Sequence, residues 1–129
     1  MKVRAPRPSS ESVGELEAAV LAELWESGEL ATPEVFERVG RPRGLAYTTI
    51  LTVLQRLHRK GLARRREEGK SHRYEAAISR NAFAERRGQF LAGEIAALGP
   101  AGVAAFLAEV QRLDPAVVEA ARKMLEASS

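Results

Sequence analysis

The stretch Tyr47-Thr-Thr-Ile-Leu-Thr-Val-Leu-Gln-Arg-Leu-His-Arg-Lys60, followed by Gly61, decides the fold of this 129-residue chain. At about 100° per residue, its apolar side chains fall on one stripe of a helix. The opposite face carries no carboxylate and consists of Thr48, Thr52, Gln55, Arg56 and Arg59. Hydroxyls followed by arginines suit contacts with base edges and phosphates, whereas a solvated helix face normally mixes both charge signs. Taken alone, the segment fits a DNA-facing helix and an ordinary basic surface helix about equally well.

The residues after Gly61 favour the first interpretation. Residues 62–74 form two short extended runs around the turn signal Glu68-Gly69. A helix followed at once by a basic hairpin is typical of a winged helix-turn-helix, in which hairpin cations contact phosphates beside the groove. The hairpin cations are Arg64, Arg65, Arg66, Lys70, His72 and Arg73. The alternative is a surface hairpin with a solubilising charge run, but its position directly after the helix favours binding.

The remaining parts of a helix-turn-helix lie upstream. Ser12-Val-Gly-Glu15 predicts a capping box at the start of a first helix, which ends before Gly28. Thr32 is the expected N-cap of a short second helix, with proline at its first position and Gly40 at its end. Residues 41–44 then form the turn into the polar-faced helix.

Together these residues resemble the penicillinase-repressor family of bacterial transcription regulators (BlaI/MecI/CopY type). The resemblance is close over about residues 12–76 and rests on Leu16-Glu17, Leu24-Trp25, Leu45-Ala-Tyr-Thr-Thr-Ile-Leu-Thr-Val-Leu-Gln-Arg-Leu57, Lys60-Gly61-Leu62 and the run from Gly69 to Tyr74. It implies a homodimeric winged-helix repressor that places its third helix in the major groove of a two-fold symmetric operator. It also assigns DNA contacts to Thr48, Thr49, Thr52 and Arg56, with wing contacts near Arg73.

Charge is concentrated on the segment that holds the helix and the hairpin. Residues 38–87 carry 14 cations and 4 anions, a net charge of +10 against +3 for the whole chain. This segment is an electrostatic footprint for a polyanion, and it lacks the Trp/Phe/Leu-rich face that a membrane-surface helix needs. The predicted double-stranded DNA contacts are Thr48, Thr49, Thr52, Gln55, Arg56, Arg59, Arg65, Lys70 and Arg73.

The sequence of the C-terminal part predicts three short helices that carry apolar stripes and no catalytic or ligand-binding motif. These stripes would be buried best against the same helices of a second subunit, although folding back onto their own domain is the alternative. The predicted dimerisation residues are Phe90, Ile95, Val103, Phe106, Leu107, Val110, Val117, Val118 and Leu125. The predicted fold is therefore mainly α with a small β-hairpin: a flexible arm over 1–11, a winged-helix domain over 12–77 and a helical dimerisation region over 78–129.

Other functions find little support in the composition. There is no cysteine, and His58, His72 and Asp114 form no catalytic or metal-ligand spacing, so we expect no enzyme activity, no cofactor and no metal site. The first residues lack the apolar core of a signal peptide, and no run is long enough to insert into a membrane, so a cytoplasmic location is expected. A winged-helix module that binds protein without sequence-specific DNA binding stays open as the alternative.

Regulation is where the chain departs from the family. Copper-responsive relatives use cysteine motifs that this chain lacks. In the antibiotic-resistance members, a membrane sensor protease from the same operon induces cleavage at an Asn-Phe pair, and Ala105-Phe106 stands at that position here. Cleavage at this bond is therefore in doubt, and the sequence identifies neither the inducing signal nor the operator.

Overall fold

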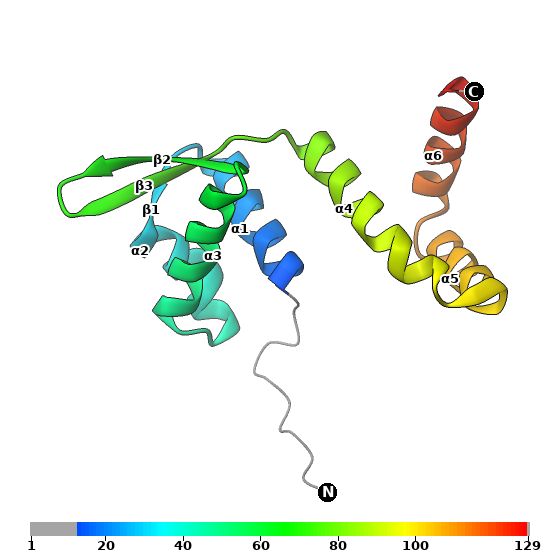
Figure 1. Ribbon diagram of the computed structural model, residues 1–129, viewed down its shortest axis with the longest axis horizontal. Coiled ribbons are helices and arrows are strands. Elements are labelled where there is room, and N and C mark those ends of the chain that lie inside the picture. The colour runs from blue at the N-terminus through cyan, green and yellow to red at the C-terminus, as the bar shows by residue number, and fades with distance from the viewer. Residues whose placement is uncertain (1–12, 129) are drawn as a thin grey trace, which may run out of the picture. The chain divides into compact units, whose positions relative to one another are not determined.

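The computed structural model describes residues 13–128 and divides the chain into two units, one up to Ala84 and one from Glu85 (Figure 1). Helices predominate and a β-hairpin is present, as the sequence predicted, and a third short strand completes one antiparallel sheet. The elements of the first unit are α1 (Val13–Ser27), β1 (Leu30–Ala31), α2 (Thr32–Val35), a π-helical turn (Phe36–Gly40), a 3-10 turn (Arg41–Arg43), α3 (Tyr47–Arg59), β2 (Ala63–Glu68) and β3 (Ser71–Ala76). α4 (Arg80–Ala96), α5 (Gly99–Leu113) and α6 (Pro115–Ser128) follow.

The core of the first unit lies where α3 packs against α1. Ile50, Leu54 and Leu57 of α3 are fully buried, and they belong to the same apolar cluster as Leu21 and Leu24 of α1. Burial of each such side chain contributes roughly 1.5–3 kcal/mol. The apolar stripe predicted from the helical period is therefore confirmed, and its burial fixes which face of α3 remains outside.

The second helix begins one residue earlier than predicted. Its N-cap is Ala31, which is extended, and the Ala31 N–H donates a hydrogen bond of 2.8 Å to Oε1 of Glu34. Thr32, the expected N-cap, is instead the first helical residue and is buried. The reason is that Ala31 pairs with Arg73 in the sheet, so the helix starts directly where the strand ends. Ser12 and the predicted arm over residues 1–11 lie outside the described residues.

The predicted hairpin is present and is anchored by a strand that the sequence analysis missed. β2 and β3 pair with Arg66 opposite Arg73, and Gly69 takes the left-handed conformation, φ 64°, that the tight turn requires. β1 pairs along the other edge of β3, with Leu30 opposite Tyr74, so the strand order is β1-β3-β2. The hairpin is therefore tied to the loop between α1 and α2.

The first turn of α4 belongs to the first unit, whereas the sequence placed the domain boundary at residue 77. Oγ of Ser79 accepts a hydrogen bond of 3.1 Å from the Ala82 N–H, which caps the helix. Trp25 Nε1 donates to the Ile78 carbonyl over 2.8 Å. The Trp25 ring meets the buried ring of Phe83 edge-on at 5.9 Å. Phe83, which the sequence grouped with the later helices, is thus a core residue of the first unit.

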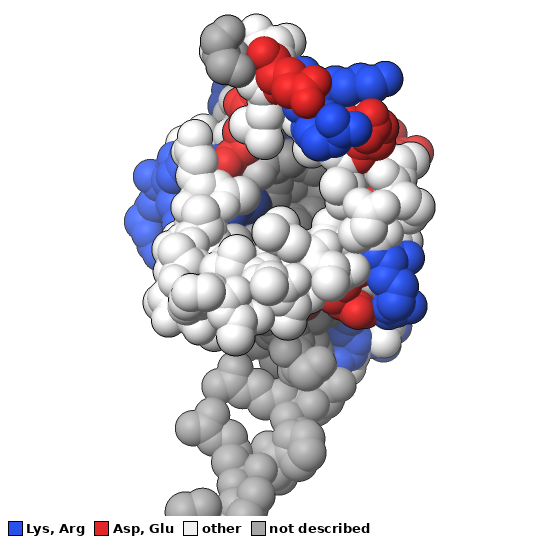
Figure 2. All heavy atoms as spheres, turned by 90° about the vertical axis from the view of Figure 1, so that its right-hand side faces the viewer, with Lys and Arg blue, Asp and Glu red and all other residues white. Residues whose placement is uncertain are grey.

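The second unit contains the rest of α4 together with α5 and α6. Asp114 caps α6 by accepting a hydrogen bond of 3.1 Å from the Val117 N–H. Neither α5 nor α6 contains a buried residue. The face shown in Figure 2, over α5 and α6, is largely uncharged, with charged side chains at its margins. No described helix has both the length and the apolar character needed to cross a membrane.

Candidate nucleic-acid interface

The polar face of α3 forms the wall of a shallow groove of about 300 Å³. The residues that line the groove are Leu16, Thr48, Thr49, Thr52, Val53 and Arg56. Four of these six were predicted as DNA contacts, and Thr49, which lies at the edge of the polar face by helical period, lines the groove with the others. The Thr48 and Thr52 side chains are exposed, and Arg56 is half-buried. The hydroxyls and a guanidinium thus converge on one surface.

The cations of α3 that were predicted to contact DNA meet no carboxylate within the part of the chain that the structure describes. Among residues 13–128, no carboxylate forms an ion pair with Arg56 or Arg59. Gln55 completes the face beside them and is half-buried. A row of unpaired guanidiniums beside exposed hydroxyls is suited to phosphate oxygens and to the acceptor edge of guanine.

A partly buried ion pair holds the C-terminal end of α3 against α1. Lys60 Nζ lies 2.7 Å from Oε2 of Glu17, whose side chain is 5% exposed. Lys60 caps the helix at its C-terminal end, where a cation also interacts favourably with the helix dipole. Glu17 and Lys60 therefore fix the orientation of α3, a role that the sequence analysis did not assign to either residue.

The hairpin cations divide into paired and unpaired groups. Arg64 pairs with Glu75 at 3.1 Å, and Arg66 donates to both carboxylate oxygens of Glu29 at 2.8 and 2.9 Å. Arg65 and Lys70 are exposed and form no ion pair within the described part of the chain. Of the predicted wing contacts, these two are the ones whose charge is available to phosphate.

Arg73 is placed differently from the expectation of a solvent-facing phosphate contact. Its side chain is only 24% exposed and lies near three carboxylates: Glu29 at 3.1 Å, Glu34 at 3.5 Å and Glu68 at 3.6 Å. Hydrogen bonds from Arg66, and secondarily from Arg73, hold the pKa of Glu29 below its usual value against the opposing effect of burial. Glu29 therefore stays ionised, and Arg73 is engaged inside the first unit.

The turn before α3 is fixed by contacts around Phe36. The Arg41 guanidinium lies 5.2 Å from the centroid of the Phe36 ring and donates to both carboxylate oxygens of Glu37. These hydrogen bonds lower the pKa of Glu37 and raise that of Arg41. Phe36 also meets Tyr47, the first residue of α3, at 5.6 Å. Side-chain contacts therefore hold the N-terminal end of α3 in place, as the Glu17–Lys60 ion pair holds its C-terminal end.

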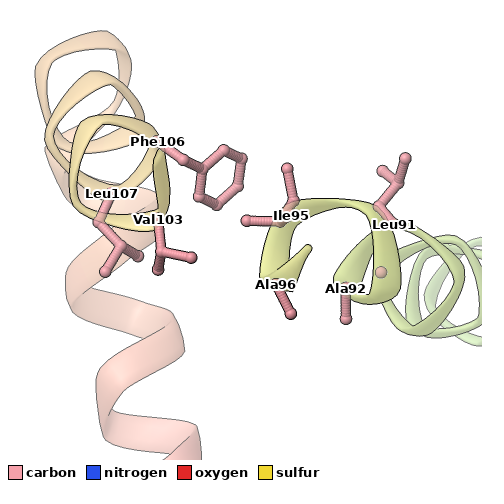
Figure 3. Close-up of a pocket in the computed structure, with 8 residues that line it drawn as sticks. Leu91, Ala92, Ile95, Ala96, Val103, Phe106 and Leu107 are labelled. Carbon is pink, nitrogen blue, oxygen red and sulfur yellow. The ribbon is translucent and has the colours of Figure 1, made fainter. Parts of the chain in front are cut away.

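The predicted dimerisation residues all lie in the second unit, and none of them is buried. Ile95, Val103, Phe106 and Leu107 line one hollow of about 410 Å³ between α4 and α5, in which Phe106 points toward Ile95 (Figure 3). Phe106 is 42% exposed and Leu107 is 58% exposed. The other five predicted residues, Phe90, Val110, Val117, Val118 and Leu125, are not part of the lining of this hollow.

The described residues contain no cluster of side chains that could bind a metal ion. Across residues 13–128, no group of three histidine, cysteine or carboxylate side chains comes close enough together to hold a metal ion. His72 instead lies beside Tyr74, with ring centroids 6.3 Å apart.

Comparisons with known proteins place the chain in a family. The family model described as penicillinase repressor matches residues 13–127. The transcriptional regulator BlaI of Mycobacterium tuberculosis is 44% identical over 63 residues, which cover 48% of this chain and 46% of that protein. The chain thus spans about half the length of the curated relatives it matches.

Two solved structures are similar to this chain in part. The solution structure of the DNA-binding domain of the repressor BlaI has 25% identity and a TM-score of 0.49, covering 59% of this chain and 90% of that one. The YusO protein from Bacillus subtilis has 19% identity and a TM-score of 0.46, covering 88% and 72%. Because both TM-scores lie below 0.5, the assignment rests on the family match. That match describes a repressor and not an enzyme, as the sequence predicted, and the chain belongs to the penicillinase repressor family.

Proposed function

We propose that this chain is a transcriptional repressor that binds a two-fold symmetric DNA operator as a homodimer. The observation that carries the proposal is the polar face of α3, where Arg56 and Arg59 have no ion-pair partner among the described residues while the opposite face is buried. Membership of the penicillinase repressor family supports it. A helix placed in this way enters the major groove with its N-terminal residues next to the base edges.

The proposed contacts are of two kinds, those that recognise the base sequence and those that bind the phosphate backbone. Thr48, Thr49 and Thr52 lie toward the N-terminal end of α3 and are assigned to base edges and the adjoining phosphates. Gln55, Arg56 and Arg59 follow along the same face, where their longer side chains reach guanine or phosphate oxygens. Arg65 and Lys70 of the wing supply sequence-independent phosphate contacts. We assign Arg73 to the shape of the wing, because its guanidinium is occupied by carboxylates.

The second unit supplies the proposed dimer contact. Its large apolar residues Phe106 and Leu107 on α5 and Val117 on α6 are between 42% and 58% exposed, which is unusual for two neighbouring short helices in water. Pairing with a second copy would bury them in a self-complementary interface. A dimer would also pair two α3 helices with the two halves of a symmetric operator.

Two further parts of the proposal concern the setting in the cell. We place the protein in the cytoplasm, where a DNA-binding regulator meets its operator. Membership of the family supports a membrane sensor protease from the same operon as its inducing partner, although Ala105 stands where the family's cleavage position has Asn. The candidate bond, Ala105–Phe106, lies inside α5, so cleavage there requires local unwinding of the helix. A neighbouring gene for a membrane metalloprotease would support this partner, and its absence from the operon would contradict it.

The test of DNA reading is a pair of single-cation variants in the full-length protein. A duplex is first enriched from a random pool by the wild type and is then titrated with Arg56→Ala and with Lys123→Ala, a control that removes one cation from α6. Arg56→Ala should lose about 1–3 kcal/mol of affinity for the enriched duplex, because a good base or phosphate contact is worth that much. Lys123→Ala should bind as the wild type does.

Two other outcomes of this experiment would contradict the assignment of α3 as the DNA-reading helix. Equal affinities of Arg56→Ala and wild type would exclude α3 as the reading helix. Failure of the wild type to retain any duplex at low salt would favour the alternative function, a winged-helix module that binds protein without sequence-specific DNA binding.

A further inference from the structure

A glutamate from outside the hairpin lies against two of its arginines. Glu29 follows Gly28, whose φ is 84°, and precedes β1, so its backbone position is set by the loop that leads into the sheet. Its carboxylate accepts hydrogen bonds from Nε and Nη2 of Arg66 at 2.9 and 2.8 Å and from Nε of Arg73 at 3.1 Å. Its backbone carbonyl accepts a fourth, from Nη2 of Arg73 at 3.2 Å.

Without Glu29, the two arginines would repel one another. Arg66 and Arg73 stand directly opposite in the antiparallel β2–β3 pair, so their side chains share a face, and like charges in such a pair are destabilising. Glu68 approaches both arginines, at 3.4 and 3.6 Å, and Glu34 approaches Arg73 at 3.5 Å. Two cations thus face three carboxylates, and Glu29 is the only one of these carboxylates for which the structure records side-chain hydrogen bonds from both arginines.

This geometry limits what the wing offers to a phosphate. A guanidinium that already donates to a carboxylate has to give up those hydrogen bonds before it can bind phosphate, and its charge is offset in the meantime. Arg65 and Lys70 are under no such restraint within the described residues. The wing therefore presents fewer cations that are available to bind phosphate than its sequence contains.

Building on the proposed DNA binding, we propose that Glu29 is a positioning residue for that activity: it holds Arg66 and Arg73 against the loop that precedes β1 and so leaves the phosphate contacts of the wing to Arg65 and Lys70. Each phosphate contact adds affinity for every sequence, so an acidic residue that withholds two cations from phosphate lowers the affinity for random DNA. The affinity for the operator falls by the same factor, so Glu29 sets the overall strength of DNA binding and leaves the preference for operator over random sequence unchanged.

The test compares two variants that remove the same charge from the same region of the full-length protein. Glu29→Gln removes the negative charge and one of the two acceptor oxygens that hold the arginines, whereas Glu67→Gln removes a carboxylate of β2 for which the structure records no ion pair among the described residues. The probe is a labelled duplex of random sequence, titrated at several salt concentrations. Glu29→Gln should bind it more tightly and steepen the slope of log K against log salt by up to about 1.8, or roughly 0.9 for each additional phosphate that is neutralised. Glu67→Gln should keep the wild-type slope.

A steeper slope is a readout that a purely structural role would not produce, because a disordered wing neutralises fewer phosphates. The triple variant Glu29→Gln/Arg66→Gln/Arg73→Gln should return to the wild-type slope, since the released cations are gone. The proposal is overturned if Glu29→Gln matches Glu67→Gln, if it binds random DNA more weakly, or if the slope of the triple variant is shallower than that of the wild type by about 1.8, the value for two phosphates. The proposed DNA binding itself is judged by the wild type alone, which has to bind the same duplex.

Discussion

At the scale of single residues, Glu17 and Lys60 show how unequal the two halves of one ion pair can be. The Glu17 side chain is 5% exposed, whereas that of Lys60 is 42% exposed. Lys60 can turn into solvent when its partner is removed, but Glu17 cannot. The energetic cost therefore depends on which of the two residues is changed.

This asymmetry predicts the stability of two neutral variants. Lys60→Met should lower the free energy of unfolding by about 1–3 kcal/mol, because it leaves a buried carboxylate without its hydrogen-bond partner. Glu17→Gln should cost about 1 kcal/mol or less, since the amide oxygen still accepts from Lys60 and the released charge reaches water. Denaturant unfolding of both variants measures the difference, and equal losses would show that the cost does not depend on which of the two residues is changed.

The sequence could point to those candidate residues whose placement follows from a pattern within a single helix. Thr48, Thr52 and Arg56 follow from the period of one helix, because the buried stripe of α3 determines the opposite face. Glu17 and Glu29 carry no such pattern. Their partners lie 43 positions away for Glu17 and 37 and 44 positions away for Glu29, so only the folded chain brings them together.

At the scale of elements, the turn between α2 and α3 depends on a glycine for reasons of space. Gly40 is buried, and a Cβ built on it would lie 2.7 Å from Cγ1 of Ile50 and 2.7 Å from Cδ1 of Phe36. Ile50 is fully buried in the core, so it has little freedom to move aside. The close approach of this turn to α3 is what sets the position of the polar face.

Gly40→Ala should therefore destabilise the first unit by about 1–3 kcal/mol through overpacking. Gly93→Ala provides the control, because Gly93 is a helical glycine in α4 whose added Cβ would meet no atom within 4 Å. That substitution should stabilise by roughly 0.5–1 kcal/mol through the higher helix propensity of alanine. Thermal unfolding distinguishes the two, and a neutral Gly40→Ala would mean that the turn adjusts without moving α3.

The wing yields a second prediction at this scale. Neutralising Arg65 and Lys70 together should weaken binding to all duplexes nearly alike and flatten the dependence of log K on log salt by about 0.9 for each phosphate that the wing no longer neutralises. The preference for the enriched duplex over random DNA should survive, because α3 is unchanged. If the double variant kept its full salt dependence and showed no such preference, the wing would be reading bases.

The ends of helices were predictable where a glycine or a capping side chain marks them. Gly44 and Gly61 take positive φ angles of 68° and 77° on either side of α3, and Asp114 caps α6. β1 was missed because two residues, Leu30 and Ala31, are too few to show any alternation. Its pairing with β3 also explains why the N-cap of α2 is Ala31 and not Thr32.

At the scale of the whole chain, the charge of a segment overstates the charge that the folded unit presents. Residues 38–87 sum to +10, but several of their cations meet carboxylates from the acidic first third. Lys60 pairs with Glu17, Arg66 with Glu29 and Arg41 with Glu37. The sequence correctly locates the basic surface, but only the fold determines which cations on it remain available.

The division into two units predicts where the chain can be cut. A chain that ends at Ala84 retains Phe83 and the Ile78 carbonyl that accepts from Trp25 Nε1, whereas one that ends at Ala77 has neither. The longer fragment should fold, and the shorter one should be less stable by about 3–5 kcal/mol, the cost of deleting a buried aromatic side chain. Urea unfolding of the two fragments measures this difference, and equal stability would place Phe83 outside the core.

The same cut separates DNA binding from dimerisation. The fragment that ends at Ala84 lacks the apolar surface of α5 and α6, so it should be monomeric and bind a single half-site weakly, because tethering two half-site contacts raises affinity through effective concentration. In the full-length protein, Leu107→Glu should have the same effect, since it puts a charge on a side chain that is 58% exposed in the single chain and that we place in the interface. Its control is Ala108→Glu, the neighbouring exposed position of α5. Sedimentation alongside operator titration measures both properties, and a fragment that still dimerises and binds the full operator as tightly as the intact chain would show that the second unit serves another purpose.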